Sequence, residues 1–351
     1  MNFSQYITCI PNSGHRIGHK LNDLITGFIL AEWYGLEYIH SALPDKWESF
    51  FGFGEGEKLF TEVVKNNDIS IISWSPLLGV QRFHSKQYFL LDYLETLETK
   101  GRRFLKKIPV SKIRQWRKPY WDGVPFEVIE HFFLNNQYQQ NDMIYCFHKA
   151  VRVMLYQVHT WGKEGKIDSN IYHNVIQNLR NKYHTKPHYA KKSYFEPEVY
   201  NIAIHIRRDD ATINNNRFLS LDFYQNIFRQ IQEVFKYENY EFHIYSSGKT
   251  KEMNQIRETF SQLTKQVKFH LNESAMEAIH HMAIADILVT GHSSFSDWAG
   301  FLSHNVKLYH PHFHMFNLDE TEWIKVDDQG NFNQDCFQDR LENLINSKLL
   351  N

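Results

Sequence analysis

The chain has 351 residues, of which 42% are hydrophobic and 23% charged, and its formal net charge is −1. These fractions are those of an ordinary globular protein, and the balanced charge excludes a strong overall field that would attract nucleic acid or an anionic membrane. No stretch approaches the roughly 18 apolar residues of a membrane span, and the cysteines Cys9, Cys146 and Cys336 have no paired spacing. We expect no nucleic-acid partner, no membrane span and a cytoplasmic location.

The first half of the chain begins with a strand, a helix and a second strand. Apolar residues predict a strand at 6–10, and an apolar stripe with a period of three and four predicts a helix at 18–34. Gly35 is expected to end this helix before a strand at 37–40. This order predicts a parallel α/β layer, whereas residues 44–192 indicate several helices and few strands.

The second half alternates strands and helices, as in a doubly wound parallel sheet. A Lys-, His-, Tyr- and Pro-rich stretch at 184–197 is the candidate linker. We expect an N-terminal α/β domain at 1–192 that binds the acceptor side and a C-terminal Rossmann-like domain at 193–351. The expected elements of the second domain are strands at 199–206, 241–245, 267–271, 287–290 and 306–309, and helices at 221–237, 251–263, 275–285 and 296–303.

The segment with the strongest chemical signal is Arg207-Arg208-Asp209-Asp210, which directly follows the strand that ends at Ile206. Ligands of open α/β sheets bind just outside the carboxyl ends of the strands. Adjacent guanidinium groups there can bind a diphosphate bidentately and stabilise the charge that develops as a nucleotide leaves. The alternative is a surface corner in which the arginines pair with Asp209 and Asp210.

Three segments together resemble the fucosyltransferase superfamily, which includes the α1,2- and α1,6-fucosyltransferases and the protein O-fucosyltransferases. His205-Ile206-Arg207-Arg208-Asp209-Asp210 is similar to its H-x-R-R-x-D signature, and residues 285–300 resemble its strand, Ser-Ser-Phe-Ser turn and helix. Residues 13–22 resemble its glycine-rich acceptor-side loop, although His15, Arg16 and Ile17 stand where small residues are usual.

This resemblance implies a GT-B-like α/β fold, with two Rossmann-like domains facing across a cleft. It also implies an inverting, metal-independent glycosyltransferase that moves a sugar from a nucleotide-sugar donor, GDP-fucose, to a hydroxyl of a carbohydrate acceptor. The alternatives are a related transferase that uses another nucleotide sugar, or a non-catalytic protein that binds a nucleotide sugar or a carbohydrate.

The resemblance assigns the donor site to Arg207, which would bind the β-phosphate. Residues that would shape the same pocket or lie under the diphosphate and the sugar are His205, Arg208, Ser293, Ser294, Phe295 and Ser296. A helix that begins here would also direct backbone N–H groups at an anion, although Ser294 or Ser296 could simply cap that helix. We place Ser246 and Ser247, at the end of another strand, near the ribose or the base.

The acceptor hydroxyl needs a base, for which Asp209, Asp210 and Glu32 are candidates and Asp209 is nearest to the arginines in sequence. Asp209 could instead only hold Arg207 in place. The acceptor-side residues implied by the resemblance are Gly14, His15, Arg16, Gly18 and Asn22.

We expect no metal ion and no cofactor besides the donor. His310, His312 and His314 alternate and could share one face of a strand, but neither a Cys pair nor an H-E-x-x-H run accompanies them. No Asp-x-Asp pair is present to hold Mn²⁺ or Mg²⁺. The basic runs at 100–107 and 112–118 are interpreted as solvated surface rather than as a nucleic-acid site.

Overall fold

The computed structural model describes residues 4–11, 16–66, 68–75, 79–85, 130, 133, 142–148, 164–166, 168, 170–185, 194–196, 198–211, 217–235, 239–311 and 322–349. The chain divides into two compact units, Met1–Lys186 and Pro187–Asn351. Each unit has its own six-stranded sheet. The two Rossmann-like sheets expected from the sequence are therefore confirmed, and their arrangement across a cleft stays a prediction.

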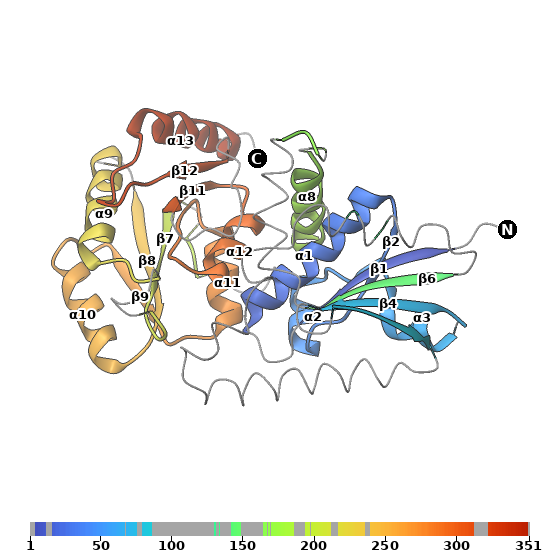
Figure 1. Cartoon of the computed structure of the whole chain (residues 1–351). Coiled ribbons are helices and arrows are strands. Elements are labelled where there is room, and N and C mark those ends of the chain that lie inside the picture. Colours follow the sequence, from blue (N-terminus) through green and yellow to red (C-terminus); the bar gives the residue numbers. More distant parts are fainter. Residues whose placement is uncertain are drawn as a thin grey trace. The chain divides into compact units, whose positions relative to one another are not determined.

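The N-terminal unit is built on a sheet of order β3-β2-β1-β6-β4-β5, in which only the β4–β5 pairing is antiparallel among the described strands (Figure 1). Its strands are β1 (Gln5–Ile10), β2 (Glu37–His40), β3 (Lys58–Leu59), β4 (Ser70–Ser75), β5 (Gly79–His84) and β6 (Met143–His148). Its described helices are α1 (Ile17–Tyr34), α2 (Asp45–Phe51), α3 (Phe60–Asn66) and α8 (Asn170–His184).

Helix α1 follows the prediction closely, because its limits are set by local chemistry. Gly35 ends it with φ of 62°, a left-handed conformation that glycine adopts without steric cost, and its N–H bonds the carbonyl of Ala31. Gly27 lets α1 approach the sheet, since a Cβ there would lie 2.8 Å from the Tyr38 ring and 3.1 Å from the backbone nitrogen of Cys9. The close approach joins α1 to β1 and β2.

The expectation of few strands between residues 44 and 192 is wrong, because β3, β4, β5 and β6 all lie there. Strand β6 is buried along its whole length, so its sequence is a continuous apolar run without the polar alternation of a half-exposed strand. Such a short run does not distinguish a buried strand from a buried helix.

The C-terminal unit has a wholly parallel sheet of order β12-β11-β10-β7-β8-β9. Its strands are β7 (Tyr200–Arg207), β8 (Tyr240–Ser247), β9 (Val267–Leu271), β10 (Ile287–Val289), β11 (Val306–Tyr309) and β12 (Trp323–Lys325). Its helices are α9 (Leu221–Val234), α10 (Thr250–Ser261), α11 (Ala275–Ile284), α12 (Ser294–Leu302) and α13 (Gln334–Leu349). The helices α9 and α10 lie on the opposite side of the sheet from α11 and α12 (Figure 1).

The two faces of this sheet have different chemistry. The even-numbered residues of β7, such as Ile202 and Ile204, join an apolar core with α9, α10 and α13. On the other face, polar rings contact one another: the buried His243 and His270 lie 3.1 Å apart from Nδ1 to Nε2, and the partly buried Tyr194 ring stacks on His281 at 3.5 Å. The first face supplies most of the apolar burial, and the second face leads to Arg207.

Most elements of this unit agree with the sequence expectations to within three residues at each end. Ser220 caps α9 as predicted, since its hydroxyl accepts the N–H of Phe223 at 3.1 Å. The elements β12 and α13 were not predicted from the sequence. None of the described helices combines the length and the apolar character needed to span a bilayer.

Gly300 provides a test of how tightly α12 packs on β12. A Cβ at this position would overlap the Trp323 ring, with 2.8 Å to Cζ2, and both residues are buried. We expect Gly300→Ala to destabilise the protein by about 1–3 kcal/mol, because the core must shift to accept the methyl group. Urea unfolding measures this change. In a double-mutant cycle, Gly300→Ala should cost less in the Trp323→Leu background than in the wild type, and an equal cost in both backgrounds would contradict the proposed contact.

Candidate functional site

The strand order of the C-terminal unit places a topological switch point between β7 and β10. The chain goes outward from β7 to β8 and β9, then returns to pair β10 with the other side of β7. Ligands of open parallel sheets bind at the carboxyl ends of the two strands where the direction of winding reverses. Here those ends carry residues 205–211 and 290–293.

Arg207 lies at this switch point with its guanidinium held in a fixed orientation. Its Nε and Nη2 donate to the two carboxylate oxygens of Asp210 at 3.0 and 2.9 Å, and its Nη1 donates to the backbone carbonyl of His292 at 2.8 Å. The side chain is 12% exposed. The contact with His292 joins the end of β7 to the loop after β10.

Asp210 is a partner of Arg207, and it is one of the two aspartates that the sequence alternative named. Asp210 also lies 3.3 Å from Nη1 of Arg217. Asp209 is exposed and adopts a left-handed conformation with φ of 48°. This turn packs against Gly248, where a Cβ would lie 3.1 Å from the Asp209 nitrogen. Asp209 is therefore placed at the surface of the turn next to the arginines.

Arg208 is buried and serves the structure of the turn. Its Nη1 donates to the carbonyls of Arg207 and Leu219 at 2.8 and 3.2 Å, and its guanidinium lies 4.6 Å from the centre of the Phe218 ring. Burial lowers the pKa of Arg208 somewhat from its ordinary value. These contacts use the Arg208 guanidinium inside the turn, so Arg208 is not placed as a second bidentate ligand for a diphosphate.

His205 is 9% exposed, and its Nδ1 has no hydrogen-bond partner within the described part of the chain. Burial, with the positive charges of Arg207 and Arg208, lowers the pKa of His205 to about 3. Gly291 makes room for this ring, since a Cβ there would lie 3.1 Å from Nδ1 and 3.2 Å from the Tyr224 hydroxyl. A neutral imidazole can exchange hydrogen bonds with a ligand but does not act as a cation at neutral pH.

The serine-rich turn begins helix α12, and the cap is Ser293 rather than Ser294 or Ser296. The Ser293 hydroxyl accepts the N–H of Phe295 at 3.3 Å. The Ser296 hydroxyl is buried and bonds the carbonyls of Gly291 and Ser293 at 3.3 and 3.1 Å. Thus Ser296 braces the loop, and Ser294 is buried as well, whereas Phe295 is partly exposed near His205 with 5.8 Å between the ring centres.

The two serines predicted near the ribose or base have different environments. The Ser246 hydroxyl is buried and donates to the carbonyl of Ile206 at 2.6 Å, which ties β8 to β7. Ser247 is exposed and pairs with Arg207 in the strand register. Only Ser247 therefore presents its side chain at the surface of the carboxyl edge.

Sequence reasoning missed Asp297, which lies in the first turn of α12 and is 1% exposed. Burial raises the pKa of Asp297 well above its ordinary value, and the positive charge of Arg207 lowers it by less. A carboxyl group near Arg207 therefore favours its protonated form. The only available signal was an acidic residue three positions after the start of a helix, which normally indicates a simple charge–dipole contact.

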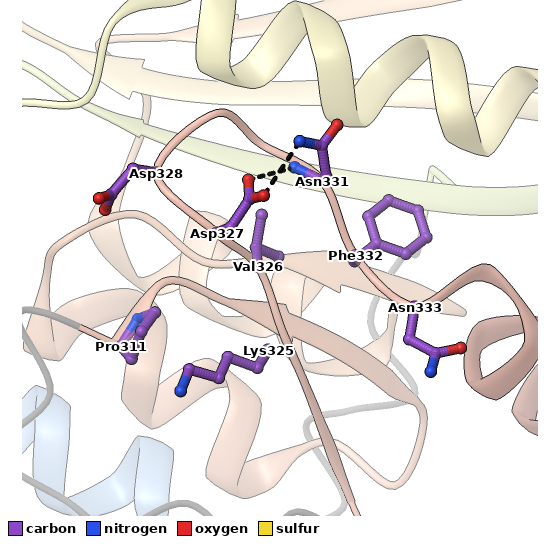
Figure 2. A pocket seen from close by; sticks show the side chains of 8 residues that line it. All are labelled: Pro311, Lys325, Val326, Asp327, Asp328, Asn331, Phe332 and Asn333. Atoms are coloured by element: carbon purple, nitrogen blue, oxygen red, sulfur yellow. Dashed lines mark hydrogen bonds between the residues drawn. The ribbon is translucent and has the colours of Figure 1, made fainter.

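A second group that was not predicted, although His310 was considered as a metal ligand, lies after β10, β11 and β12. His292 Nε2 is 2.7 Å from His310 Nδ1, and His310 Nε2 is 2.8 Å from a carboxylate oxygen of Asp328. Asp328 lines a pocket of about 620 Å³ on the carboxyl side of these strands (Figure 2). The other lining residues are Pro311, Lys325, Val326, Asp327, Asn331, Phe332 and Asn333.

The alternating histidines do not form a recognisable metal site in the described residues. His310 bonds His292 and Asp328 instead, and His312 and His314 lie outside the described residues. No group of three or more potential ligand side chains with metal-binding geometry occurs in the described ranges. The basic runs at 100–107 and 112–118 also lie outside them.

The predicted acceptor-side residues belong to the N-terminal unit. Arg16 is exposed and precedes α1, whereas Gly18 and Asn22 are buried within that helix. Gly14 and His15 lie outside the described residues. Glu32, a candidate base, is exposed near the carboxyl end of α1.

No family model matches this sequence, and no curated protein matches it. Solved structures that this chain matches include apo POFUT1, with 13% identity, coverage of 86% of this chain and 95% of that one, and a TM-score of 0.44. NodZ fucosyltransferase from Bradyrhizobium has 12% identity, coverage of 86% and 93%, and a TM-score of 0.35. The UDP-GlcNAc 2-epimerase of Methanocaldococcus jannaschii has 13% identity, a TM-score of 0.30, and coverage of 64% of this chain and 54% of its own.

The buried histidines predict an acid-sensitive C-terminal unit. Burial lowers the pKa of both His205 and His243 from 6.5 to about 3. Between pH 6.5 and pH 3 these histidines are protonated in the unfolded chain but not in the folded one. The free energy of unfolding is therefore highest above about pH 6.5 and falls as the pH decreases. We expect His243→Asn to weaken this dependence, by up to about 2 kcal/mol at pH 5 relative to pH 7.5.

Hydrogen exchange of the amides in β7 and β8 at the two pH values measures this difference within the C-terminal unit. His304→Asn is the matched control, because His304 is exposed in the same unit. Equal pH dependence in His243→Asn and the wild-type protein would contradict the assignment.

Proposed function

We propose that this protein is an inverting, metal-independent glycosyltransferase that transfers fucose from GDP-fucose to a hydroxyl of a carbohydrate acceptor. The observation that carries the proposal is the partly buried guanidinium of Arg207 at the β7–β10 switch point, held by Asp210 and the His292 carbonyl. The resemblance of residues 205–210 to the H-x-R-R-x-D signature supports the choice of donor.

Arg207 would bind the β-phosphate of the donor. When the bond between the sugar and the diphosphate breaks, the leaving nucleotide gains negative charge, which a preorganised guanidinium stabilises more in the transition state than in the ground state. The first turn of α12, with its N–H groups directed out of the helix, would support the same anion. His205 would contribute hydrogen bonds as a neutral imidazole.

Asp210 already presents two carboxylate oxygens to Arg207, so the guanidinium has the orientation that a bidentate phosphate needs. An incoming diphosphate would share or replace this partner. Arg217 lies close enough to keep Asp210 paired if it moves away from Arg207. The internal ion pair is thus compatible with a phosphate site.

We assign the acceptor side to the N-terminal unit, with Arg16, Gly18 and Asn22 in or beside the first helix and Gly14 and His15 before it. Asp209 is the proposed base, because it is exposed and adjacent to the arginines in sequence. Abstraction of the acceptor proton by a carboxylate accompanies attack of the hydroxyl oxygen on the anomeric carbon, with inversion.

Incubation with GDP-fucose and an oligosaccharide array, read by mass spectrometry, tests the proposal. We expect the mass of one deoxyhexose to be added to an acceptor in the presence of EDTA. Arg207→Ala should reduce transfer at least about 100-fold and Arg207→Lys should restore only part of it, because a lysine cannot bind bidentately. Arg229→Ala is the control, since Arg229 is an exposed arginine of α9 in the same unit.

Transfer that is lost with EDTA would contradict the metal-independent mechanism. Transfer from a UDP-sugar alone would identify another donor, and GDP-fucose binding without transfer to any acceptor would identify a binding protein. Wild-type activity in Arg207→Ala would remove the site assignment.

A further inference from the structure

Three successive strands end in a hydrogen-bonded chain that the proposed chemistry does not use. Its members are His292 after β10, His310 after β11 and Asp328 after β12, joined at 2.7 and 2.8 Å. Both histidines are 4% exposed, whereas the Asp328 side chain is 65% exposed. This series of hydrogen bonds therefore connects the surface with the buried loop at the switch point.

The carboxylate at the outer end determines which nitrogen of each ring carries hydrogen. Asp328 can only accept, so Nε2 of His310 must donate to it. In a neutral His310 the Nδ1 atom is then an acceptor, and Nε2 of His292 must donate to it. A substitution of Asp328 would thus change which nitrogen of His310 carries hydrogen, and through His310 the hydrogen bond of the His292 ring.

His292 also connects this chain to Arg207, because its backbone carbonyl accepts the Nη1 hydrogen at 2.8 Å. The ring and the carbonyl belong to one residue in a short loop, so holding the ring restricts the position of the carbonyl. Ser296 fixes the preceding residue, Gly291, from the other side with bonds to its nitrogen and carbonyl at 3.2 and 3.3 Å. The edge of the Phe223 ring packs on His310 at 5.6 Å.

We propose that Asp328 is a positioning residue for the anion-binding site at Arg207 and acts through His310 and His292. This inference rests on the proposed function, since it assigns Asp328 a role in binding the donor's diphosphate. The carboxylate and the two rings fix the loop that orients one face of the guanidinium, while Asp210 orients the other.

Asp327 offers a matched control in the same turn and the same pocket. Its carboxylate accepts the N–H groups of Gln329 and Asn331 at 2.9 and 2.8 Å and the Asn331 side-chain amide at 3.0 Å. In Figure 2 the Asp328 side chain points away from this pair. Asp327→Asn removes the same charge as a change at Asp328 and keeps an acceptor for the turn.

The first measurement uses the full chain labelled with ¹⁵N-histidine and reads the tautomers by long-range ¹H–¹⁵N correlation NMR. Signals of His310 and His292 are assigned by their loss in His310→Phe and His292→Gln. We expect both rings to carry hydrogen on Nε2 in the wild-type protein. Asp328→Ala should shift the nitrogen signals of His292, although the described hydrogen bonds connect Asp328 to His292 only through His310. Unchanged His292 signals in Asp328→Ala would overturn the proposal, whether or not the protein binds a nucleotide.

The second measurement is the affinity for GDP by calorimetry, with thermal unfolding as the check on folding. We expect Asp328→Ala and His310→Phe to bind GDP about tenfold more weakly, and Asp327→Asn to bind as the wild type does. His292→Gln should bind more tightly than His292→Phe, because glutamine keeps an N–H donor near the ε position. Equal weakening in Asp328→Ala and Asp327→Asn would overturn the proposal in favour of a general charge effect.

The two measurements separate the failures of the two proposals. If the wild-type chain does not bind GDP although the His292 signals respond to Asp328→Ala, the choice of nucleotide is wrong while the connection between Asp328 and the loop holds. If GDP binds and Asp328→Ala neither weakens it nor shifts His292, the positioning role is wrong while the proposed function stands.

Discussion

The contact between Arg207 and the backbone carbonyl of His292 joins the two strands on which the candidate site depends. The strands β7 and β10 are neighbours in the sheet, but the chain reaches one from the other only after passing through β8, β9 and three helices. A guanidinium at the end of β7 can therefore bond a loop 85 residues away in sequence. With Asp210 on its other edges, Arg207 is held before any ligand arrives, which reduces the reorganisation that binding a phosphate would require.

The two faces of the C-terminal sheet divide stability and chemistry between them. The apolar face with α9, α10 and α13 buries a continuous set of Ile, Phe and Leu side chains. The opposite face buries imidazoles that are kept neutral, such as His205 and His243, because burial removes the hydration of their charged forms and nearby positive groups oppose protonation. Burying polar rings costs free energy unless they are hydrogen-bonded, so this face stabilises the fold less than an apolar one would. The polar face of the sheet beside Arg207 is nonetheless suited to a ligand rich in hydroxyl and phosphate oxygens.

The sequence predicted the C-terminal sheet well because its elements have strong local signals. The helix α9 has an apolar stripe and a serine cap, and the strands β9 and β11 have the predicted bounds. Arg207 could be placed at a carboxyl strand end, because its position depends only on where β7 ends. The hydroxyls of Ser246 and Ser296 were harder to interpret, since both are used inside the fold, and a sequence does not tell whether a serine bonds a ligand or the backbone. In the N-terminal unit β6 was missed, because a strand buried on both faces has no alternation to detect.

The charges around Arg207 explain why the remaining members of the site could not be found from local patterns. Arg207 and Asp210 balance each other, and Asp297, although it lies in the first turn of α12, has its pKa raised by burial, which favours the neutral acid. A diphosphate bound to Arg207 would lie beside the Asp210 carboxylate on the same guanidinium. These two anions would repel each other. The site can remain electrostatically balanced only if Asp210 keeps a second cation, and Arg217 at 3.3 Å is such a partner. The pairing of Arg207 with Asp210 is local in sequence, whereas the approach of His292 and Asp297 to Arg207 depends on which strand ends the parallel sheet brings together.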